Sequence, residues 1–458
     1  MKEVHKFGGT SVDKMEQVIK VIISRKDKNP YVTVSAFSGF TDKLLECIDL
    51  AENQKPFDTK LFDAFIEFHL KKIEEGSADK ETANFLKEKF AEFFQKNSPR
   101  IQRAYENIIK KGYSAKDHDT ILGFGEQISA FVLSELLTLR LKSEERKGKF
   151  IDLGEAVNAD FSEANHVFLE ALKESVSKKV IDEKEDDEIL IMTGFIGAVP
   201  GGILHSIDRG YTDFTGAFVS ALLHAKRYII FKEVDGVCSA DPRIVTKGCL
   251  LLKELSYTEV LKMASGGMKA VNTEAVKPAM KESIPIEVRN LMSPEKEGTI
   301  ILASREMQEN RYIQNIPVKK GVCIIRFGGY NDSMESNLEM KLLSLLDKHK
   351  IRRFFSTSDG AGTSVVLPFH EKKIEMLMDD LSVFGVVKII KDCGIIAIVG
   401  EEMRGQVGVI AKASDSLAAE GISIHMIAQG ASEIGIDFVI PEERINDAIG
   451  SLHKTFFS

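Results

Sequence analysis

The sequence predicts an α/β protein with a mainly parallel sheet, followed by a smaller repeated unit. From the start to about residue 300, short β-rich runs alternate with amphipathic helical stretches, which is typical of parallel strands joined by helical crossovers. Because 458 residues exceed what one hydrophobic core usually supports, we expect two or three domains. The clearest strands are expected at 4–7, 31–35, 189–193 and 228–234.

A long charged segment interrupts this alternation between about residues 57 and 111. Its phenylalanines recur at near-helical spacing, so we expect a helical insertion whose aromatic rings form a core rather than a cofactor site. These residues are Phe62, Phe65, Phe68, Phe85, Phe90, Phe93 and Phe94.

An internal repeat follows the polar stretch at 305–314. Segment 351–368 (IRRFFSTSDGAGTSVVLP) parallels segment 422–441 (ISIHMIAQGASEIGIDFVIP). In each copy a strand follows a helix, and a glycine-containing turn leads to a second strand that ends in proline. Two βαββα units of roughly 70 residues each are therefore expected. Their size and element order resemble ACT modules, which are small ferredoxin-like sheets that bind free amino acids.

Composition narrows the class of function. Apolar residues make up 43% and charged residues 28% of the chain, as in ordinary globular proteins, and the net charge of −8 offers no attraction to nucleic acid. The five cysteines are widely spaced, without a CxxC pair, which fits a reducing compartment. The first residues run straight into a charged strand without the apolar stretch of a signal peptide, and nowhere do about 18 apolar residues run uninterrupted, so we expect neither secretion nor membrane insertion. We expect a cytoplasmic protein with small-molecule partners and no membrane contact.

The first chemical motif is Lys6-Phe7-Gly8-Gly9-Thr10-Ser11, where a strand ends and a helix is expected to begin. Adjacent glycines let backbone N–H groups approach phosphate oxygens closely, and a helix N-terminus favours anions. Lys6 would add a full positive charge. Taken alone, such a pair of glycines is most often only a turn, so the interpretation depends on the other motifs.

Three further motifs also stand at expected strand-to-helix junctions. They are 35–41 (SAFSGFT), 123–129 (GFGEQIS) and the pair 193–197 (TGFIG) with 208–217 (DRGYTDFTGA). In the last of these, Arg209 offers a planar fork for a carboxylate, while Asp213 can orient lysines or a magnesium ion. The alternative is a surface Arg–Asp pair of little energetic consequence.

The order and spacing of these motifs resemble the aspartate kinase family of the amino-acid-kinase superfamily, over essentially the whole chain. The matching segments are KFGGTSV, VSAFSGFTD, GFGEQIS, TGFIG, DRGYTDFT, VDGVCSADPR and MASGGMKAVN. The resemblance implies a mainly parallel three-layer α/β sandwich followed by two ferredoxin-like βαββαβ ACT domains, in a monofunctional enzyme. We expect the catalytic domain at 1–303, with the insertion at about 57–111, and the ACT domains at 315–390 and 391–458.

The resemblance also assigns roles to individual residues. Lys6 matches the catalytic lysine and Asp213 the aspartate that organises it, while Arg209 and Glu126 match the groups that hold the α-carboxylate and the α-amino group of aspartate. Other substrate-binding positions are Ser35, Thr41, Phe195, Gly210 and Thr212. Nucleotide-binding positions are Gly8, Gly9, Lys232, Glu233, Cys238, Arg243 and Lys269. No metal ligand among the protein side chains is implied.

The chain departs from the family pattern at three places. Tyr211 replaces a glycine, since many members have RGGSD where this chain has RGYTD. A Thr-Asp pair and a tyrosine usually line the nucleotide pocket where Lys232, Glu233 and Cys238 stand here. An LHP triplet of the family is replaced by residues 271–273 (VNT).

The implied reaction transfers the γ-phosphoryl group of ATP, with Mg²⁺, to the β-carboxylate of L-aspartate, giving 4-phospho-L-aspartate and ADP. This is the first step of lysine, threonine and methionine biosynthesis. The resemblance further implies feedback inhibition by lysine, threonine or both, bound where ACT domains meet in a homodimer or a dimer of dimers. Two alternatives are a kinase for a related acid such as glutamate or carbamate, and a catalytically weak or silent amino-acid-binding regulator.

Overall fold

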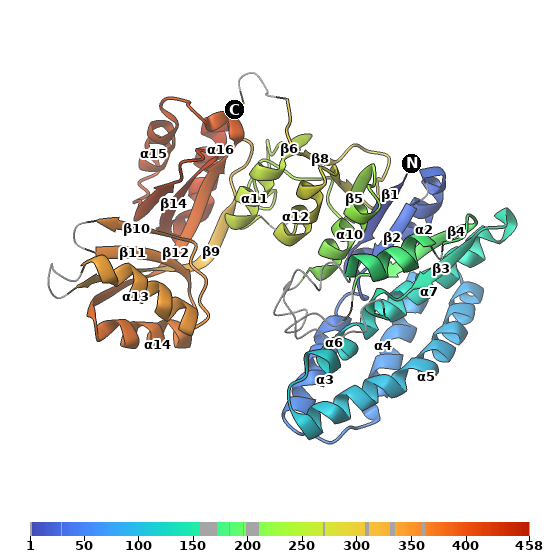
Figure 1. Cartoon of the computed structure of the whole chain (residues 1–458). Helices are drawn as coiled ribbons and strands as arrows, with labels where there is room; N and C mark the ends of the chain where they lie inside the picture. Colours follow the sequence, from blue (N-terminus) through green and yellow to red (C-terminus); the bar gives the residue numbers. More distant parts are fainter. Residues whose placement is uncertain are drawn as a thin grey trace. The chain divides into compact units, whose positions relative to one another are not determined.

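In the computed structural model, the chain folds into two compact units (Figure 1). The first comprises residues 1–237 and 271–303, and the second comprises 238–270 and 304–458. The structure describes residues 2–28, 30–155, 172–182, 184–195, 197, 210–268, 271–306, 311–329, 335–359 and 362–457. The domain ranges expected from the sequence stay a prediction, and each unit is described by itself.

The first unit is built on a largely parallel sheet with the strand order β3-β4-β2-β1-β5-β7-β8. Neighbouring strands are parallel except for the antiparallel pair β7 and β8, so the prediction of a mainly parallel sheet is confirmed. Strands β1, β2 and β4 are buried along their whole length. The bounds are β1 (Glu3–Phe7), β2 (Pro30–Val34), β3 (Lys147–Ile151), β4 (Glu188–Thr193), β5 (Arg227–Lys232), β7 (Ile286–Asn290) and β8 (Thr299–Leu302).

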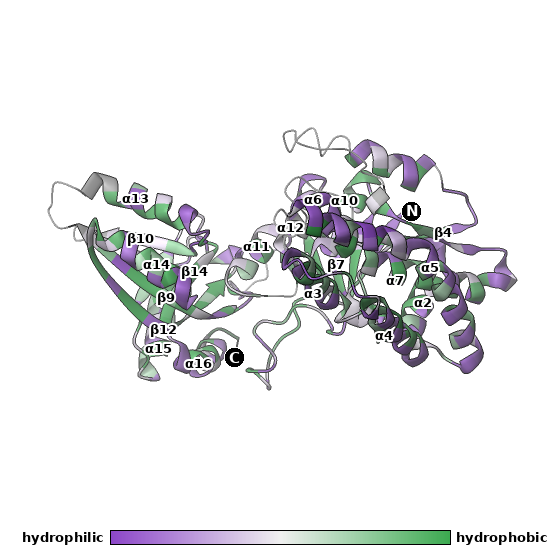
Figure 2. Cartoon of the chain, turned by 90° about the horizontal axis from the view of Figure 1, so that it is seen from below, coloured by the Kyte–Doolittle hydropathy of each residue, from purple (hydrophilic) through white to green (hydrophobic). Residues whose placement is uncertain are grey.

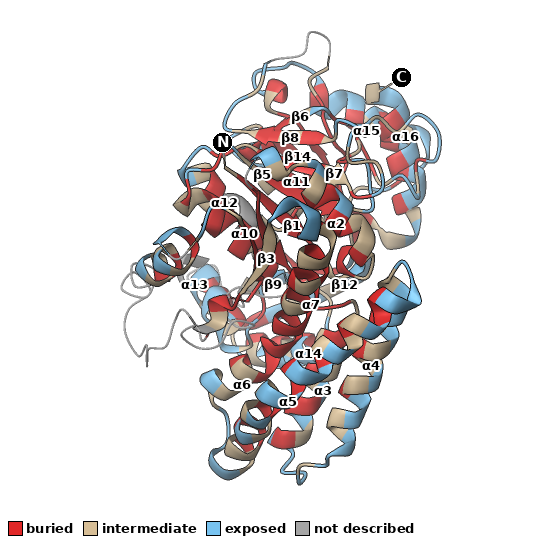
Figure 3. Cartoon of the chain, turned by 90° about the vertical axis from the view of Figure 1, so that its right-hand side faces the viewer, coloured by how far each residue is buried: buried red, intermediate tan, exposed pale blue. Residues whose placement is uncertain are grey.

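Helices cover both faces of this sheet. The pair α10 and α12 lies on one side, and α2 and α7 lie on the other (Figure 3). The helices of the unit are α1 (Gly9–Val12), α2 (Met15–Ser24), α3 (Phe40–Glu52), α4 (Lys60–Gly76), α5 (Lys80–Lys111), α6 (Ala115–Leu122), α7 (Phe124–Leu141), α10 (Tyr211–Leu222) and α12 (Thr273–Lys281). By length and composition, the stretch Ala115–Glu144 would suffice to cross a membrane, but 83% of its most apolar window is buried inside the protein, as in a core helix.

Residues 57–111 fold as the long helices α4 and α5, which pack against each other. Hydrophilic residues run along the outside of both helices (Figure 2). The phenylalanine rings meet on the inside: Phe62 lies 5.4 Å from Phe94, and Phe65 lies 5.1 Å from Phe40 of α3, measured between ring centroids. The aromatic residues of this segment therefore form a core, as the spacing predicted.

The second unit contains a six-stranded antiparallel sheet in the order β10-β11-β9-β12-β14-β13. Its strands are β9 (Val318–Gly329), β10 (Phe355–Asp359), β11 (Gly362–Pro368), β12 (Gly385–Val399), β13 (Met426–Gln429) and β14 (Gly435–Pro441). Its helices are α13 (Glu335–Lys348), α14 (Glu371–Ser382), α15 (Val409–Ala419) and α16 (Ile445–Phe457). Strand β6 (Glu254–Ser256) and helix α11 (Tyr257–Ser265) also belong to this unit.

The predicted repeat is confirmed by the element order. The run β9-α13-β10-β11-α14 is followed by β12-α15-β13-β14-α16, which is βαββα twice. Strand β12 is 15 residues long and pairs with β9 of the first repeat and β14 of the second. The expected boundary at 390/391 lies inside this strand. The two repeats are thus joined by a shared strand rather than by a linker.

A buried ion cluster holds helix α11 to the second repeat. The guanidinium of Arg305 binds the carboxylates of Glu259 and Glu402, and all three side chains are almost fully buried. Glu259 also accepts a hydrogen bond from the backbone N–H of Glu401 at 3.0 Å. Removing one partner of such a cluster leaves a buried charge uncompensated, which is strongly destabilising.

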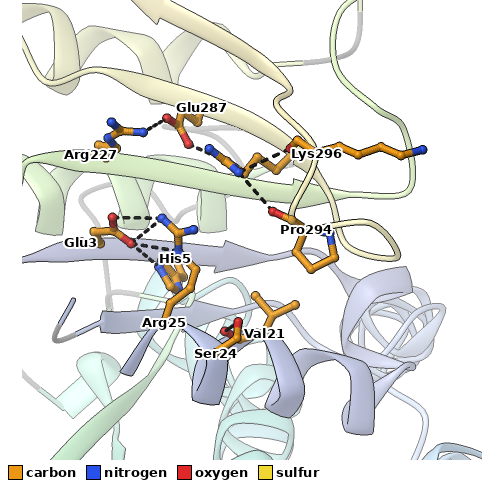
Figure 4. Close-up of polar contacts among 10 residues, drawn as sticks. Glu3, His5, Val21, Ser24, Arg25, Arg227, Glu287, Pro294 and Lys296 are labelled. Atoms are coloured by element: carbon orange, nitrogen blue, oxygen red, sulfur yellow. Dashed lines mark hydrogen bonds and ion pairs between the residues drawn. The ribbon is translucent and has the colours of Figure 1, made fainter. Parts of the chain in front are cut away.

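A second network of buried charges lies where β1, β5 and β7 begin (Figure 4). The guanidinium of Arg25 donates two hydrogen bonds of 3.0 Å to the carboxylate of Glu3, and the ring of His5 lies 3.1 Å from the same carboxylate. Glu287 pairs in the same way with Arg227 and Arg289. Burial raises the pKa of Glu3, but His5 and Arg25 outweigh it and lower the pKa to about 2.

The Glu3 contacts predict a pH-dependent contribution to stability. A carboxyl whose pKa is about 2 in the folded protein and near 4.5 in the unfolded chain stabilises the fold above pH 4.5, and this contribution is lost as the pH falls toward 2. We expect Glu3→Gln to lower the unfolding free energy by on the order of 2 kcal/mol at pH 7, and by roughly half as much at pH 3. Urea unfolding followed by circular dichroism at both pH values measures the difference.

The matched control is Glu144→Gln, which removes a carboxylate paired with Lys26 at the surface. Such exposed pairs contribute about 0–1 kcal/mol, so this variant should resemble the wild type at both pH values. A gap between Glu3→Gln and wild type that stays constant from pH 7 to pH 3 would contradict the assigned role of Glu3.

Candidate active site

The glycine turn after β1 is in tight contact with the loop after β2. A Cβ atom on Gly9 would lie 2.9 Å from the carbonyl oxygen of Ala36 and 3.3 Å from the backbone of Ser38. The side chain of Asp13 fastens the same loop by accepting a hydrogen bond of 3.1 Å from the backbone N–H of Ser38. Only glycine fits at position 9 without moving backbone atoms. A Cβ on Gly8, in contrast, would have Lys6 Nζ at 3.6 Å as its nearest neighbour, so the turn opens toward the lysine.

Lys6 and Asp213 form an ion pair that is only 9% and 8% exposed. Lys6 lies near the carboxyl end of β1, and Asp213 lies in the first turn of α10. The hydroxyl of Tyr228, on β5, donates a hydrogen bond of 2.9 Å to the backbone carbonyl of Asp213 and so fixes the start of this helix. A buried carboxylate therefore holds the lysine ammonium at the edge of the sheet.

A second lysine, Lys232, ends the neighbouring strand β5. Burial and the charge of Lys6 lower the pKa of Lys232, whereas Asp213 opposes that shift. The positive charges of Lys6 and Lys232 therefore repel each other at the carboxyl ends of adjacent strands, and Asp213 attracts both. Such an arrangement attracts an anion, because two cations compete for a single carboxylate.

Hydroxyl groups tie the remaining loops of this edge together. Ser35 donates a hydrogen bond of 3.0 Å to the hydroxyl of Thr212, and Ser129 donates one of 2.7 Å to the backbone carbonyl of Ser35. Thr215 donates one of 2.5 Å to the carbonyl of Gly194, where β4 has just ended. The loops after β2 and β4 and the N-terminal parts of α7 and α10 therefore converge.

Glu126, in the first turn of α7, is buried in this convergence at 2% exposure. The hydroxyl of Tyr211 donates a hydrogen bond of 2.8 Å to its Oε1, while no side chain or backbone donor among the described residues hydrogen-bonds Oε2. Burial raises the pKa of Glu126 to about 7, and hydrogen bonds from Tyr211 and from the backbone N–H groups of Ala36 and Glu126 partly oppose this rise. A buried carboxylate with one open oxygen is suited to receive a cationic group of a ligand.

Aromatic rings close off the site around Glu126. Phe195 is buried and meets the ring of Tyr211 edge to face, with centroids 5.8 Å apart. A Cβ on Gly123 would lie 2.8 Å from the Phe195 ring, so a glycine is needed there. The side chain of Thr41, from α3, also hydrogen-bonds Tyr211.

The structure brings together most of the site residues expected from the sequence. At the edge of the first unit's sheet where the parallel strands end, the structure places Lys6, Gly8, Gly9, Ser35, Thr41, Glu126, Phe195, Gly210, Thr212, Asp213 and Lys232. Glu233 follows β5 and pairs at 2.5 Å with Lys14, half exposed. Arg209 and Lys269 lie outside the described residues.

Two expected nucleotide-binding residues, Cys238 and Arg243, belong to the second unit. The backbone carbonyl of Cys238 accepts a hydrogen bond of 2.6 Å from Asn315, and Arg243 is an exposed side chain that pairs with Asp241. Whether they contribute to nucleotide binding stays a prediction. Among the described parts of the chain, no cluster of three or more His, Cys, Asp or Glu residues could hold a metal ion.

Sequence reasoning missed two contributors to the site. Tyr211 was recognised only as a departure from the family pattern, and Asp119, whose charge acts on the Tyr211 hydroxyl, was not singled out. Asp119 is buried at the end of the polar run that precedes the GFGEQIS motif. Sequence alone does not show that a helical aspartate is buried near a site, unless its spacing from a known motif is recognised.

The comparisons with known proteins identify the family and the fold of the chain. Residues 1–290 match the amino acid kinase family, and residues 396–456 match the ACT domain. The aspartokinase of Saccharomyces cerevisiae is 28% identical over 501 residues, which cover 99% of this chain and 92% of that protein. E. coli aspartokinase III in complex with aspartate and ADP aligns with a TM-score of 0.77 at 21% identity and covers 100% of both chains. The same enzyme with lysine and aspartate gives the same TM-score and identity, covering 100% of this chain and 99% of that one.

Substituting alanine should affect thermal stability differently at the two glycines after β1. Gly9→Ala pushes a methyl group against backbone atoms of residues 36 and 38, so we expect the melting temperature to fall by about 5 °C. Gly8→Ala meets only ordinary contacts and should change the melting temperature by about 1 °C or less. Differential scanning calorimetry of both variants checks this, and equal melting temperatures would show that the contact between the two loops is not tight.

Proposed function

This chain belongs to the amino acid kinase family, and we propose that it is an aspartate kinase that transfers the γ-phosphoryl group of ATP to the β-carboxylate of L-aspartate. The products are 4-phospho-L-aspartate and ADP. The observation that carries the proposal is the buried Lys6–Asp213 pair beside the Gly8–Gly9 turn, with Lys232 on the next strand. The named relatives support it, since E. coli aspartokinase III, whose fold this chain shares, was solved with aspartate and ADP.

The chemistry needs positive charge more than it needs a base. A β-carboxylate with an ordinary pKa near 4 is ionised at neutral pH and is already a nucleophile. Its attack on a phosphoryl group brings two anions together, so catalysis consists of in-line placement and charge neutralisation. Lys6, held by Asp213, supplies a cation with little freedom to move, and Lys232 supplies a second nearby.

The residues at this edge fit the phosphates of a nucleotide. The Gly8–Gly9 turn carries no side chains and opens toward Lys6 Nζ, so backbone N–H groups can approach phosphate oxygens closely. Gly8, Gly9, Lys6 and Lys232 would hold the phosphates. Bound Mg²⁺ would neutralise charge on the transferring group.

Glu126 would confer selectivity for an amino acid over other carboxylates. Its open Oε2 can accept hydrogen bonds from an α-ammonium group in a water-poor environment, where such contacts are strong. Arg209, by the family resemblance, would hold the α-carboxylate. A substrate that lacks either charge would leave one of these groups unpaired, which costs binding free energy.

A hydroxamate-trapping assay tests the function and separates it from its alternatives. With ATP, Mg²⁺ and hydroxylamine, aspartate should yield its hydroxamate, and glutamate should react at least about 100-fold more slowly in kcat/KM. Lys6→Ala protein prepared in the same way controls for contaminating kinases. A preference for glutamate would reassign the substrate, and no product with either acid would favour the silent amino-acid-binding regulator.

We propose further that the second unit senses an amino acid. Residues 396–456 match the ACT domain, and E. coli aspartokinase III was also solved with lysine. In this chain, Gly405 and Gly408 adopt positive φ angles of 72° and 84° between η6 (Glu401–Met403) and α15. The proposal comprises feedback by lysine, threonine or both at ACT interfaces of a homodimer or a dimer of dimers. It places the enzyme at the first step of lysine, threonine and methionine synthesis in the cytoplasm.

Titrating lysine and threonine into the activity assay tests the sensor. At least one of them should inhibit, and Gly408→Ala should raise the inhibitory concentration several-fold, because alanine strains a backbone with φ near 84°. Gly450→Ala, on helix α16 with open space around it, is the matched control and should respond like the wild type. No response of the wild type to either amino acid would refute the sensor role.

A further inference from the structure

We propose that Tyr211 is a positioning residue that sets substrate selectivity: its hydroxyl holds Oε1 of Glu126 and leaves Oε2 as the single acceptor for the substrate's ammonium group. The inference rests on the proposed function and deepens it. It starts from Tyr211, which stands where the family resemblance led us to expect a glycine.

Three separate segments of the chain build this contact. Tyr211 is the first residue of α10, Glu126 comes from the first turn of α7, and Thr41 comes from the start of α3. The Tyr211 hydroxyl donates to Glu126 Oε1 at 2.8 Å, and Thr41 hydrogen-bonds the tyrosine in turn. Since both Tyr211 and Glu126 are almost fully buried, water does not compete for the bond.

Packing fixes where the hydroxyl can be. The tyrosine ring meets Phe195 at an interplanar angle of 88°, and Phe195 in turn fills the space next to Gly123. Gly210, the preceding residue, has a φ angle of 108°, which turns the chain sharply into α10. A side chain that packs against the Phe195 ring and follows a glycine turn has little rotational freedom, so its hydrogen bond orients Glu126 at low entropic cost.

The hydrogen bond also favours the charged form of Glu126. Burial favours the neutral acid, and Tyr211 is the side-chain donor that opposes this effect. Burial and the carboxylates of Glu126 and Asp119 raise the pKa of Tyr211 well above its usual value, so the hydroxyl remains a donor at all physiological pH values. Without it, Glu126 would take up a proton at a higher pH and lose its attraction for an ammonium group.

The variant Tyr211→Phe tests this role in aspartate kinetics between pH 6 and pH 9. We expect kcat within about twofold of wild type and a KM for aspartate raised about tenfold at pH 7, with the difference narrowing toward pH 9, where Glu126 ionises even without the hydrogen bond. The inhibition constant of succinate, which is aspartate without its ammonium group, should change by less than about twofold.

Tyr105→Phe is the matched control, since Tyr105 is another buried tyrosine, on helix α5, whose hydroxyl donates to the backbone carbonyl of Lys55. It should leave the aspartate KM and its pH profile unchanged. If Tyr211→Phe behaves in the same way, or loses kcat and aspartate affinity equally at every pH, the proposal is wrong.

A second variant keeps the proposal testable if Tyr211→Phe does not fold. Glu126→Gln should raise the aspartate KM and remove its pH dependence between pH 6 and pH 9, and a wild-type pH profile in this variant would overturn the proposal. These outcomes can be told apart from a failure of the proposed function. A wild type without aspartate kinase activity refutes the function itself. An active wild type whose Tyr211→Phe variant keeps the wild-type aspartate KM refutes only the role of Tyr211.

Discussion

The ion pair between Lys6 and Asp213 is the constraint on which the site depends. A lysine within a fully buried strand would be costly without a partner, and the carboxylate at the start of α10 compensates its charge. Because Lys6 points to the face that α10 covers, β1 and α10 must keep their relative positions for the pair to form. Because the two buried charges are stabilised only as a pair, the fold holds the ammonium group of Lys6 at the edge of the sheet.

Parallel strands explain why so many polar groups meet there. The carboxyl ends of β1, β2, β4 and β5 lie at one edge of the sheet, so the loops that follow them are neighbours although they lie far apart in the sequence. Glycines at positions 9, 123 and 194 let these loops approach closely, and serine and threonine hydroxyls then satisfy their backbone carbonyls. Rigid packing around the charged groups is the preorganisation that phosphoryl transfer requires.

The sequence predicted the sheet, the helical insertion and the repeat, because each rests on local periodicity. It also indicated Lys6, Glu126 and Asp213, since these stand in motifs with a recognisable order. It could not show that β12 serves both repeats, because strand pairing joins residues far apart in the chain. Nor could it show that Tyr211 hydrogen-bonds Glu126, because that contact joins positions 85 residues apart on two helices. The roles of Arg209 and Lys269, which lie outside the described residues, stay predictions from the family resemblance.

A double-mutant cycle on kcat for aspartate phosphorylation tests most directly whether Asp213 acts through Lys6. Lys6→Met should lower kcat by about 10³-fold and Asp213→Asn by about 10²-fold, and the double variant should be no slower than Lys6→Met alone, because the aspartate has nothing left to hold. If the two losses instead multiply, so that the double variant is about 10⁵-fold slower, the two residues act independently and the central role of their ion pair is contradicted.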